Sequence, residues 1–417
     1  MLSARLIKPK WITGFSWPLF LAAMLLIIPS LIIAWLSISR QDYFQQHLEN
    51  ISFSDYRLLA LCFGCYLLAW LALIIIKPAN NNYFLWLTAA IIFIISLVTV
   101  PLLSRDAAAY ALNADMVYYG HFNPYIEPIN LGRQSFQLGS LWWLNHPSPY
   151  GPLFLLIIAL PFLVSAGNLL AFIFSYKILV LLAFGLSGYL FSRYRRQLNL
   201  PSYLDWFFWL NPALIINWLT EGHQEIFIVL ILLWLLSSQS KSHCHQLGLL
   251  SLGFIKIIAI ILWPLSWFKN QIFNWRRFWL GGILLAATWL LFFAIIGLTP
   301  LDFWHKNLAF TDQHCFYACS PLVMATNQLP AGIADVSRLI LLIGAYLATL
   351  YCCLFKKYQP LKFIVWSLLA LFFIHTKWLT PWYPTLIIPF TLLIKERKYL
   401  VIGGFLTAYC LWHYLGL

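Results

Sequence analysis

Charged residues are scarce in this chain. Only 9% of its 417 residues are Asp, Glu, Lys or Arg, whereas 62% are apolar. Ordinary soluble domains carry about 25% charged and about 45–50% apolar residues. A water-soluble globule with so few charges could not hide this much apolar surface, so lipid must be the solvent for most of the chain. The composition therefore excludes a soluble enzyme, a nucleic-acid binder and a disordered protein.

Acids are scarcer still, with 13 against 26 basic residues and a net charge of +13. In a soluble protein this excess would suggest a nucleic-acid partner. In a membrane protein it reflects orientation, because cytoplasmic loops collect Lys and Arg. No cleavable signal peptide is expected, since the first apolar run is too long and lacks a small-residue cleavage site.

The eight cysteines do not form a dense disulfide framework. Cys62 and Cys65 lie in an apolar run, where a thiol is a small hydrophobe. Cys315 and Cys319 lie in a polar loop and could pair if that loop faces an oxidising compartment.

Eleven apolar runs predict an all-α, polytopic integral membrane protein with about 11 transmembrane helices. The runs are 16–38, 57–76, 83–103, 167–192, 203–221, 224–238, 278–298, 332–355, 361–376, 379–394 and 399–416. Residues 152–165 are short, which suits an interfacial or re-entrant helix. Residues 246–268 are interrupted midway by Lys256.

The positive-inside rule predicts that the N-terminus faces the cytoplasm and the C-terminus faces outside. With eleven crossings, 17 of the 26 basic residues and only two acids fall inside. Residues 1–417 then form a single domain with two large outer loops, 104–151 and 299–331. Two short turns, 221–225 and 375–383, face the same side.

The loop 104–151 is the most informative segment. Asp106 follows directly after a span and should lie at the boundary between membrane and water. Residues 105–119 predict a helix with Asp106, Tyr110 and Asn113 on one face. An aromatic belt would explain the loop's many Trp and Tyr residues, but not the carboxylate. The alternative interpretation of Asp106 is a helix N-cap.

A series of motifs in a fixed order carries a family resemblance. The motifs are Asp106-x-x-x-Tyr110, Gly120-x-x-Asn123-Pro-Tyr125, Pro149-Tyr150-Gly-Pro152, Leu210-Asn-Pro-Ala-Leu, Glu221-Gly-His223-Gln-Glu225 and Phe254-Ile-Lys256 followed by Trp263-Pro264. Over roughly residues 100–270 they resemble the GT-C superfamily of membrane glycosyltransferases. They are most similar to the actinobacterial polyprenol-phosphate-mannose-dependent mannosyltransferases. Two departures are Gln224-Glu225, where the family has Asn-Asp, and Ala114, where relatives tend to have Gly, so the sugar linkage is not carried over.

The resemblance implies inverting transfer of one mannose-like sugar from a polyprenyl-phosphate donor at the outer face. The acceptor would be a hydroxyl of a glycan, lipid or protein, and the membrane would be the bacterial cytoplasmic (inner) membrane. Membrane lipids are the other expected partners, and no nucleic acid is. Asp106 would be the general base, within hydrogen-bond reach of the acceptor hydroxyl. One carboxylate suffices for inversion, because a retaining double displacement also needs a nucleophile.

The leaving phosphate needs cations nearby. The candidates are Lys256, Arg105, His223 and Lys377. Lys256 is the strongest, because a lysine in an apolar run costs at least about 2.5 kcal/mol at mid-membrane. The structural alternative for Lys256 is a side chain that snorkels to the interface. The residues expected to bind sugar or acceptor are Tyr110, Asn123, Tyr125, His146, Tyr150 and Glu225.

Other polar or aromatic residues carry weaker signals. Trp382-Tyr383 could stack on a sugar face or anchor the chain in the aromatic belt. Lys177 lies in an apolar run without a motif. Asp115, about 14 Å from Asp106 along a helix axis, is expected to be solvated. No cofactor or metal is indicated, because Asp302, His305, Asp312 and His314 lack a recognised ligand spacing.

Two other functions stay open. A lipid-linked sugar flippase or transporter would place ionisable residues along a path at mid-membrane. A polyprenyl-linked polysaccharide polymerase or ligase would use cations to bind pyrophosphate lipids. Most acids of this chain lie at the predicted outer boundary, which favours the single-sugar transferase.

Overall fold

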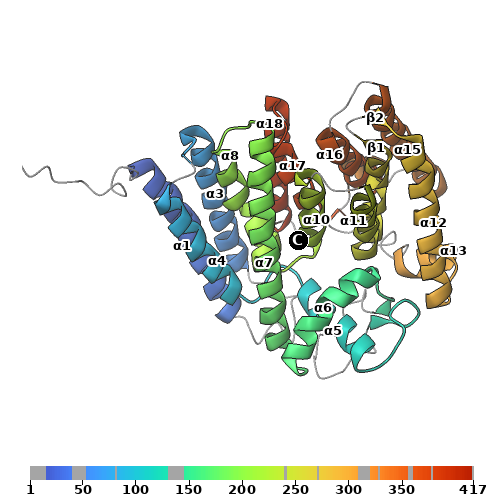
Figure 1. Cartoon of the computed structure of the whole chain (residues 1–417). Coiled ribbons are helices and arrows are strands. Elements are labelled where there is room, and N and C mark those ends of the chain that lie inside the picture. Colours follow the sequence, from blue (N-terminus) through green and yellow to red (C-terminus); the bar gives the residue numbers. More distant parts are fainter. Residues whose placement is uncertain are drawn as a thin grey trace, which may run out of the picture.

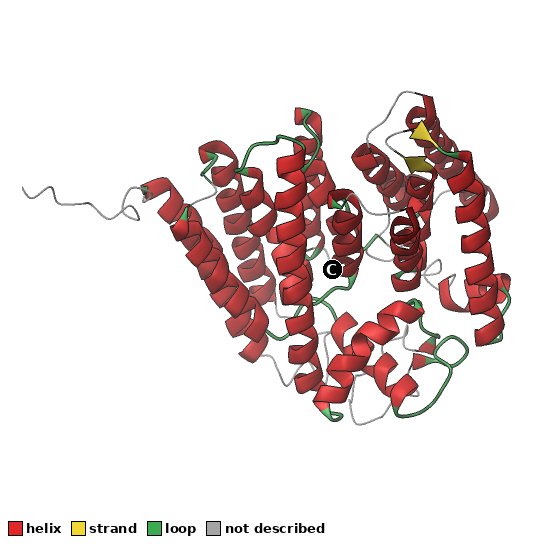
Figure 2. Cartoon of the chain, viewed as in Figure 1, coloured by secondary structure: helices red, strands yellow, loops and turns green. Residues whose placement is uncertain are grey.

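The computed structural model shows an all-helical protein whose longer helices stand side by side (Figures 1 and 2). It describes residues 16–39, 53–79, 82–129, 145–238, 242–269, 272–308, 320–326, 329–355, 360–376 and 379–415. Strands are limited to a two-residue pair in this part of the chain, β1 (Phe268–Lys269) and β2 (Ile272–Phe273).

Five helices in the described ranges are long and apolar enough to cross a membrane. They are α1 (Trp17–Ser39), α3 (Phe53–Ile76), α7 (Leu169–Gln197), α12 (Trp275–Ile296) and α15 (Ala331–Phe355). Their outward faces are apolar, as Ile75 and Ile295 show with 80% and 74% of their surface exposed. Such faces need lipid around them, so the predicted all-α integral membrane fold is confirmed.

Shorter elements make up the rest of the described fold. They are α4 (Tyr83–Val98), α5 (Asp106–Tyr118), α6 (Pro152–Ser165), α8 (Leu204–Trp209), α9 (Pro212–Leu214), η6 (Ile215–Thr220), α10 (Glu225–Ser237), α11 (Ser242–Ile255), η7 (Ile257–Trp267), α13 (Pro300–Phe303), η8 (Trp304–Leu308), α14 (Pro321–Thr326), α16 (Pro360–Ala370), η10 (Leu371–His375), η11 (Tyr383–Leu386), α17 (Ile388–Leu392) and α18 (Arg397–His413).

Two of the predicted spans are broken helices. In the span 203–221 the helix α8 ends at Trp209 and a new helix begins after Asn211. Asn211 caps the new helix, because its Oδ1 accepts hydrogen bonds from the N–H groups of Ala213 and Leu214. The run then continues as the π-helix η6. Such π-turns occur often at functional sites. The span 379–394 is likewise divided, into the 3₁₀-helix η11 and α17.

The two stretches that fitted a crossing poorly have distinct structures. Residues 152–165 form α6, a helix of only 14 residues. Residues 246–268 are interrupted at Lys256, where α11 ends and the 3₁₀-helix η7 follows. The interruption leaves Lys256 in an extended pairing with Tyr150.

The helix predicted over 105–119 forms as α5. Its alanines at 107–109, 111 and 114 are fully or almost fully buried, because α6 and α7 pack against this helix. The expectation that Asp115 is solvated is wrong, since only 2% of its surface is exposed. Dense packing on all sides of a short helix fixes the direction of its first residue, Asp106.

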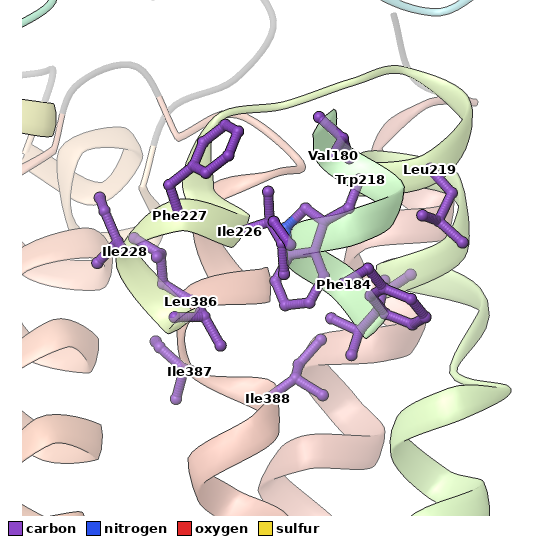
Figure 3. Packing of buried hydrophobic residues seen from close by; sticks show 14 of the residues in the cluster. Val180, Phe184, Trp218, Leu219, Ile226, Phe227, Ile228, Leu386, Ile387 and Ile388 are labelled. Atoms are coloured by element: carbon purple, nitrogen blue, oxygen red, sulfur yellow. The ribbon is translucent and has the colours of Figure 1, made fainter. Parts of the chain in front are cut away.

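A buried apolar cluster lies behind the turns 221–225 and 380–383. Figure 3 shows Trp218 of η6 among side chains of α7, of α10 and of the segment that begins with η11, including Phe184, Ile226 and Leu386. Trp218 Nε1 donates a hydrogen bond to Thr385 Oγ1 at 3.0 Å. The cluster thus holds the starts of α10 and η11 together.

Candidate functional site

The first pair of the site is Asp106 and His223. Asp106 begins α5, and its N–H donates to Ser104 Oγ at 3.2 Å. Its Oδ2 lies 3.2 Å from Nδ1 of His223, a close contact whose angles are not those of an aligned hydrogen bond. The His223 ring is fully buried and stacks on Trp382 at 4.0 Å between centroids. Asp106 keeps 17% of its side chain exposed.

The backbone around Gly222 places His223 at this position. Gly222 has a left-handed φ of +77°, which a residue with a side chain adopts only at a cost. The His223 N–H donates to the Asn217 carbonyl at 3.0 Å, which joins the turn to η6. A Cβ atom on Gly222 would lie 3.3 Å from Tyr176 Cε1. The turn therefore needs glycine for its conformation and has little space for anything larger.

The second pair is Lys256 and Glu225. Lys256 Nζ donates to Glu225 Oε1 at 2.6 Å and lies 4.3 Å from the ring centroid of Tyr383. The Glu225 side chain is fully buried, while 13% of the Lys256 side chain is exposed. The predicted cation is therefore present, but it is held by a carboxylate that the sequence assigned to the sugar or the acceptor.

A strand-like contact brings Tyr150 to this pair. Tyr150 and Lys256 form an isolated antiparallel bridge, and the Gly151 N–H donates to the Ile255 carbonyl at 3.0 Å. The two backbones are so close that a Cβ on Gly151 would lie 2.1 Å from the Phe254 carbonyl oxygen. Only glycine permits this approach, which joins the end of the loop 104–151 to the interruption at Lys256.

Three tyrosines pack together beside the two pairs. The ring of Tyr110 lies 5.1 Å from that of Tyr150 and 5.4 Å from that of Tyr176. Burial raises the pKa of Tyr110 and of Tyr150 well above the usual range, so both stay neutral phenols. The hydroxyls of Tyr110 and Tyr176, and Oε2 of Glu225, are buried without a hydrogen-bond partner among the described residues. Buried polar atoms of this kind suit a hydroxyl-rich ligand.

The remaining sequence candidates lie elsewhere or beside the cluster. Arg105 is buried directly before Asp106. Asn123 Nδ2 donates to the Ile296 carbonyl at 3.1 Å, and Tyr125 packs against Phe292 of α12. The carbonyl of His146 accepts from the Ile129 N–H at 3.1 Å. These contacts give Asn123 and Tyr125 a role in fixing the loop to α12.

Lys377, the fourth cation candidate, lies outside the described residues, as do Cys315, Cys319, Asp312 and His314. Within the ranges that the structure describes, no three His, Cys, Asp or Glu side chains gather as a metal site.

Sequence reasoning missed several residues of the cluster. Trp382 and Tyr383 were candidates for sugar stacking or membrane anchoring, but they cover His223 and Lys256 instead. Tyr176 and Glu221 were not singled out. The available signal for Glu221, Trp382 and Tyr383 is position, because the turns 221–225 and 375–383 are both predicted at the face that carries Asp106. Tyr176 lies inside an apolar run and carries no such signal.

Comparison with known proteins places the chain in a family. Residues 17–268, more than half of the chain, match the family described as alpha-(1->6)-mannopyranosyltransferase, N-terminal domain. The chain is 29% identical over 169 residues to alpha-(1->6)-mannopyranosyltransferase A of Corynebacterium glutamicum. That match covers 39% of this chain but only 34% of the relative's length. No solved structure matches the chain. The family match covers all the residues of the two pairs, and the chain belongs to the alpha-(1->6)-mannopyranosyltransferase family.

Proposed function

We propose that this protein transfers a mannosyl residue from a polyprenyl-phosphate donor to an acceptor hydroxyl, with inversion, at the outer face of the membrane. One observation carries the assignment of the base. Of the three acids Asp106, Glu221 and Glu225, the two glutamates are fully buried and Asp106 alone keeps accessible surface. The family relation supports mannose as the sugar.

The chemical step needs one base and a stabilised leaving group. Asp106 takes the proton of the acceptor hydroxyl, and the acceptor oxygen forms a bond to the anomeric carbon. The bond from that carbon to the phosphate oxygen breaks, and its electron pair stays on the polyprenyl phosphate. The leaving group is already a phosphate, so it needs cations more than it needs an acid.

Lys256 supplies such a cation, and its ammonium group is held in place by Glu225. One N–H of its ammonium group is bound by Glu225 at 2.6 Å, and the partly exposed group has further donors. The interaction with Glu225 fixes where these donors point, so Glu225 acts on the phosphate through Lys256. Arg105, next to Asp106 in the chain, is the second cation of the proposal.

The structure suggests a different role for His223 from the phosphate ligand that the sequence predicted. Its Nδ1 lies 3.2 Å from Oδ2 of the Asp106 carboxylate, and Trp382 covers its ring. We assign His223 to holding the base. The buried hydroxyls of Tyr110 and Tyr176 are the groups proposed to bind sugar hydroxyls.

The test compares purified wild type with Asp106→Asn on polyprenyl-phosphate-linked sugars. Asparagine keeps the size of the side chain but cannot take the proton. General base catalysis is typically worth about 10²–10⁴-fold in rate, so transfer should fall by about that factor. Asp302→Asn is the control, since Asp302 is an exposed acid bound to Thr299.

The outcomes separate the possible functions. Full activity in Asp106→Asn would show that the base is wrong. Transfer from pyrophosphate carriers alone would favour a polymerase or ligase, and lipid movement without transfer would favour a flippase.

A further inference from the structure

Glu221 holds the backbone that leads into Asp106. Its two carboxylate oxygens accept hydrogen bonds from three consecutive N–H groups, those of Leu102 at 3.3 Å, Leu103 at 3.0 Å and Ser104 at 2.9 Å. These residues follow the end of α4 and have no helical partners of their own. Hydrogen bonds from N–H groups to a buried charge are among the stronger ones, so the carboxylate fixes this extended segment.

Lys177 holds the same segment from its other end. Its ammonium group, fully buried in α7, donates to the carbonyls of Ser96 and Thr99 at the end of α4. These carbonyls belong to the last turn of a helix, which carries partial negative charge. Lys177 also lies within electrostatic range of Glu221. Lys177 and Glu221 thus hold residues 96–104 between them through hydrogen bonds to the backbone.

The geometry links the hydrogen bonds of Glu221 and Lys177 to the proposed base, Asp106. The N–H of Asp106 donates to Ser104 Oγ, and Ser104 is the last of the three residues bound by Glu221. Glu221 also lies two residues before His223, which contacts the Asp106 carboxylate. One short turn therefore sets both the backbone and the side-chain partner of Asp106.

We propose that Glu221 and Lys177 are positioning residues, which set the place of the Asp106 carboxylate by holding the backbone from Ser96 to Ser104. This inference rests on the proposed function of Asp106. The sequence did not predict these roles for Glu221 or Lys177. Both side chains act on the backbone before Asp106 and do not touch the proposed reacting atoms. A displacement of about 1 Å at a reacting group can cost about 100-fold in rate.

The chain contains a matched buried ion pair at the other end of α7, between Arg195 of α7 and Asp205 of α8. Arg195 Nε binds Asp205 Oδ1 at 2.8 Å, and both side chains are buried. Arg195 lies about 27 Å from Lys177 along the axis of α7. Asp205→Asn removes a buried charge from the fold but leaves the Asp106 segment untouched.

The experiment measures kcat and KM for polyprenyl-phosphate mannose with Glu221→Gln, Lys177→Met, Glu221→Asp and Asp205→Asn. Glu221→Gln should lower kcat about 100-fold and change KM by less than about threefold. Glu221→Asp keeps the charge and should recover part of the loss. The double variant of Glu221→Gln and Lys177→Met should lose less than the product of the two single losses, because the two side chains hold one segment.

A second readout does not depend on activity. Hydrogen exchange of a peptide covering residues 96–106 should be faster in Glu221→Gln and unchanged in Asp205→Asn. Glutamine replaces one of the two accepting oxygens of Glu221 by an NH2 donor, so at least one of the three N–H groups loses its acceptor. If Glu221→Gln fails to fold, the same two measurements on Glu221→Asp decide the question. Unchanged exchange, or a kcat no lower than that of Asp205→Asn, overturns the inference. If wild type transfers nothing from the donor, the proposed function fails. The exchange result then still tests whether Glu221 fixes the backbone of residues 96–104.

Discussion

Nδ1 of His223 lies 3.2 Å from Oδ2 of Asp106, while the Nε2 atom of the same ring is buried without a partner among the described residues. The ring cannot turn freely, because Trp382 is stacked against it. A fixed imidazole therefore lies beside one oxygen of the carboxylate, and 17% of the Asp106 side chain stays exposed. This arrangement suits the base proposed above, because the imidazole limits the movement of the carboxylate and leaves part of it accessible.

Replacing His223 should reduce transfer less than replacing Asp106. His223→Gln removes the fixed imidazole but leaves the carboxylate, so we expect kcat to fall about tenfold or more and to stay above that of Asp106→Asn. Steady-state kinetics on the purified protein measures this. Trp382→Phe, which keeps an aromatic ring on His223, should retain most of the activity. A His223→Gln variant with wild-type kcat would show that the contact has no catalytic consequence.

Removing Lys256 alone should destabilise the protein strongly. Lys256→Met leaves the Glu225 carboxylate buried without its partner, and breaking a buried pair in this way costs about 3–5 kcal/mol. The double variant Lys256→Met, Glu225→Leu should recover most of the stability but none of the transfer, because the cation is gone. Thermal unfolding in detergent and a transfer assay test the two halves of this prediction.

A matched control for that series is Lys362→Met. Lys362 pairs with Glu396, whose side chain is 45% exposed. Pairs of this kind are worth about 1 kcal/mol or less, so Tm should hardly change. If Lys256→Met is as stable as Lys362→Met, Glu225 does not depend on the lysine.

Gly222 and Gly297 allow backbone strain to be separated from function. Both have a left-handed φ, +77° and +72°. Alanine at either position should cost about 1–2 kcal/mol. A Cβ on Gly222 would also press on Tyr176, whereas nothing lies within 4 Å of one on Gly297. We expect both variants to lose stability, but only Gly222→Ala to lose transfer, because its turn carries Glu221 and His223. Equal kcat values in the two variants would contradict this.

The proposed orientation can be tested with exposed cysteines in a chain whose own cysteines have been replaced. Figure 1 shows α5 and α6 at one end of the molecule and β1 and β2 at the other. His121, just after α5, and Arg196, at the end of α7, are both exposed. A membrane-impermeant thiol reagent should label His121→Cys on intact cells and Arg196→Cys only after permeabilisation. The reverse pattern would place the site in the cytoplasm.

Some parts of the site were predictable because they depend on local sequence alone. The helix over 105–119 formed as α5, and the interruption of an apolar run at Lys256 coincides with the break between α11 and η7. Asp115 was wrongly expected to be solvated. Its burial results from neighbouring helices that cover every face of α5, which the sequence of α5 does not encode.

The sequence by itself determined that this is an all-helical membrane protein with an acid directly after its third apolar run, because lipid solvation acts on each segment separately. The tertiary structure decided the pairings. Glu225 binds Lys256, 31 residues away, and Glu221 binds Ser104, 117 residues away. Trp382 covers His223 from a different segment again. Which charge meets which partner depends on how the helices pack, and a buried charge is stable only where that packing supplies its counterpart.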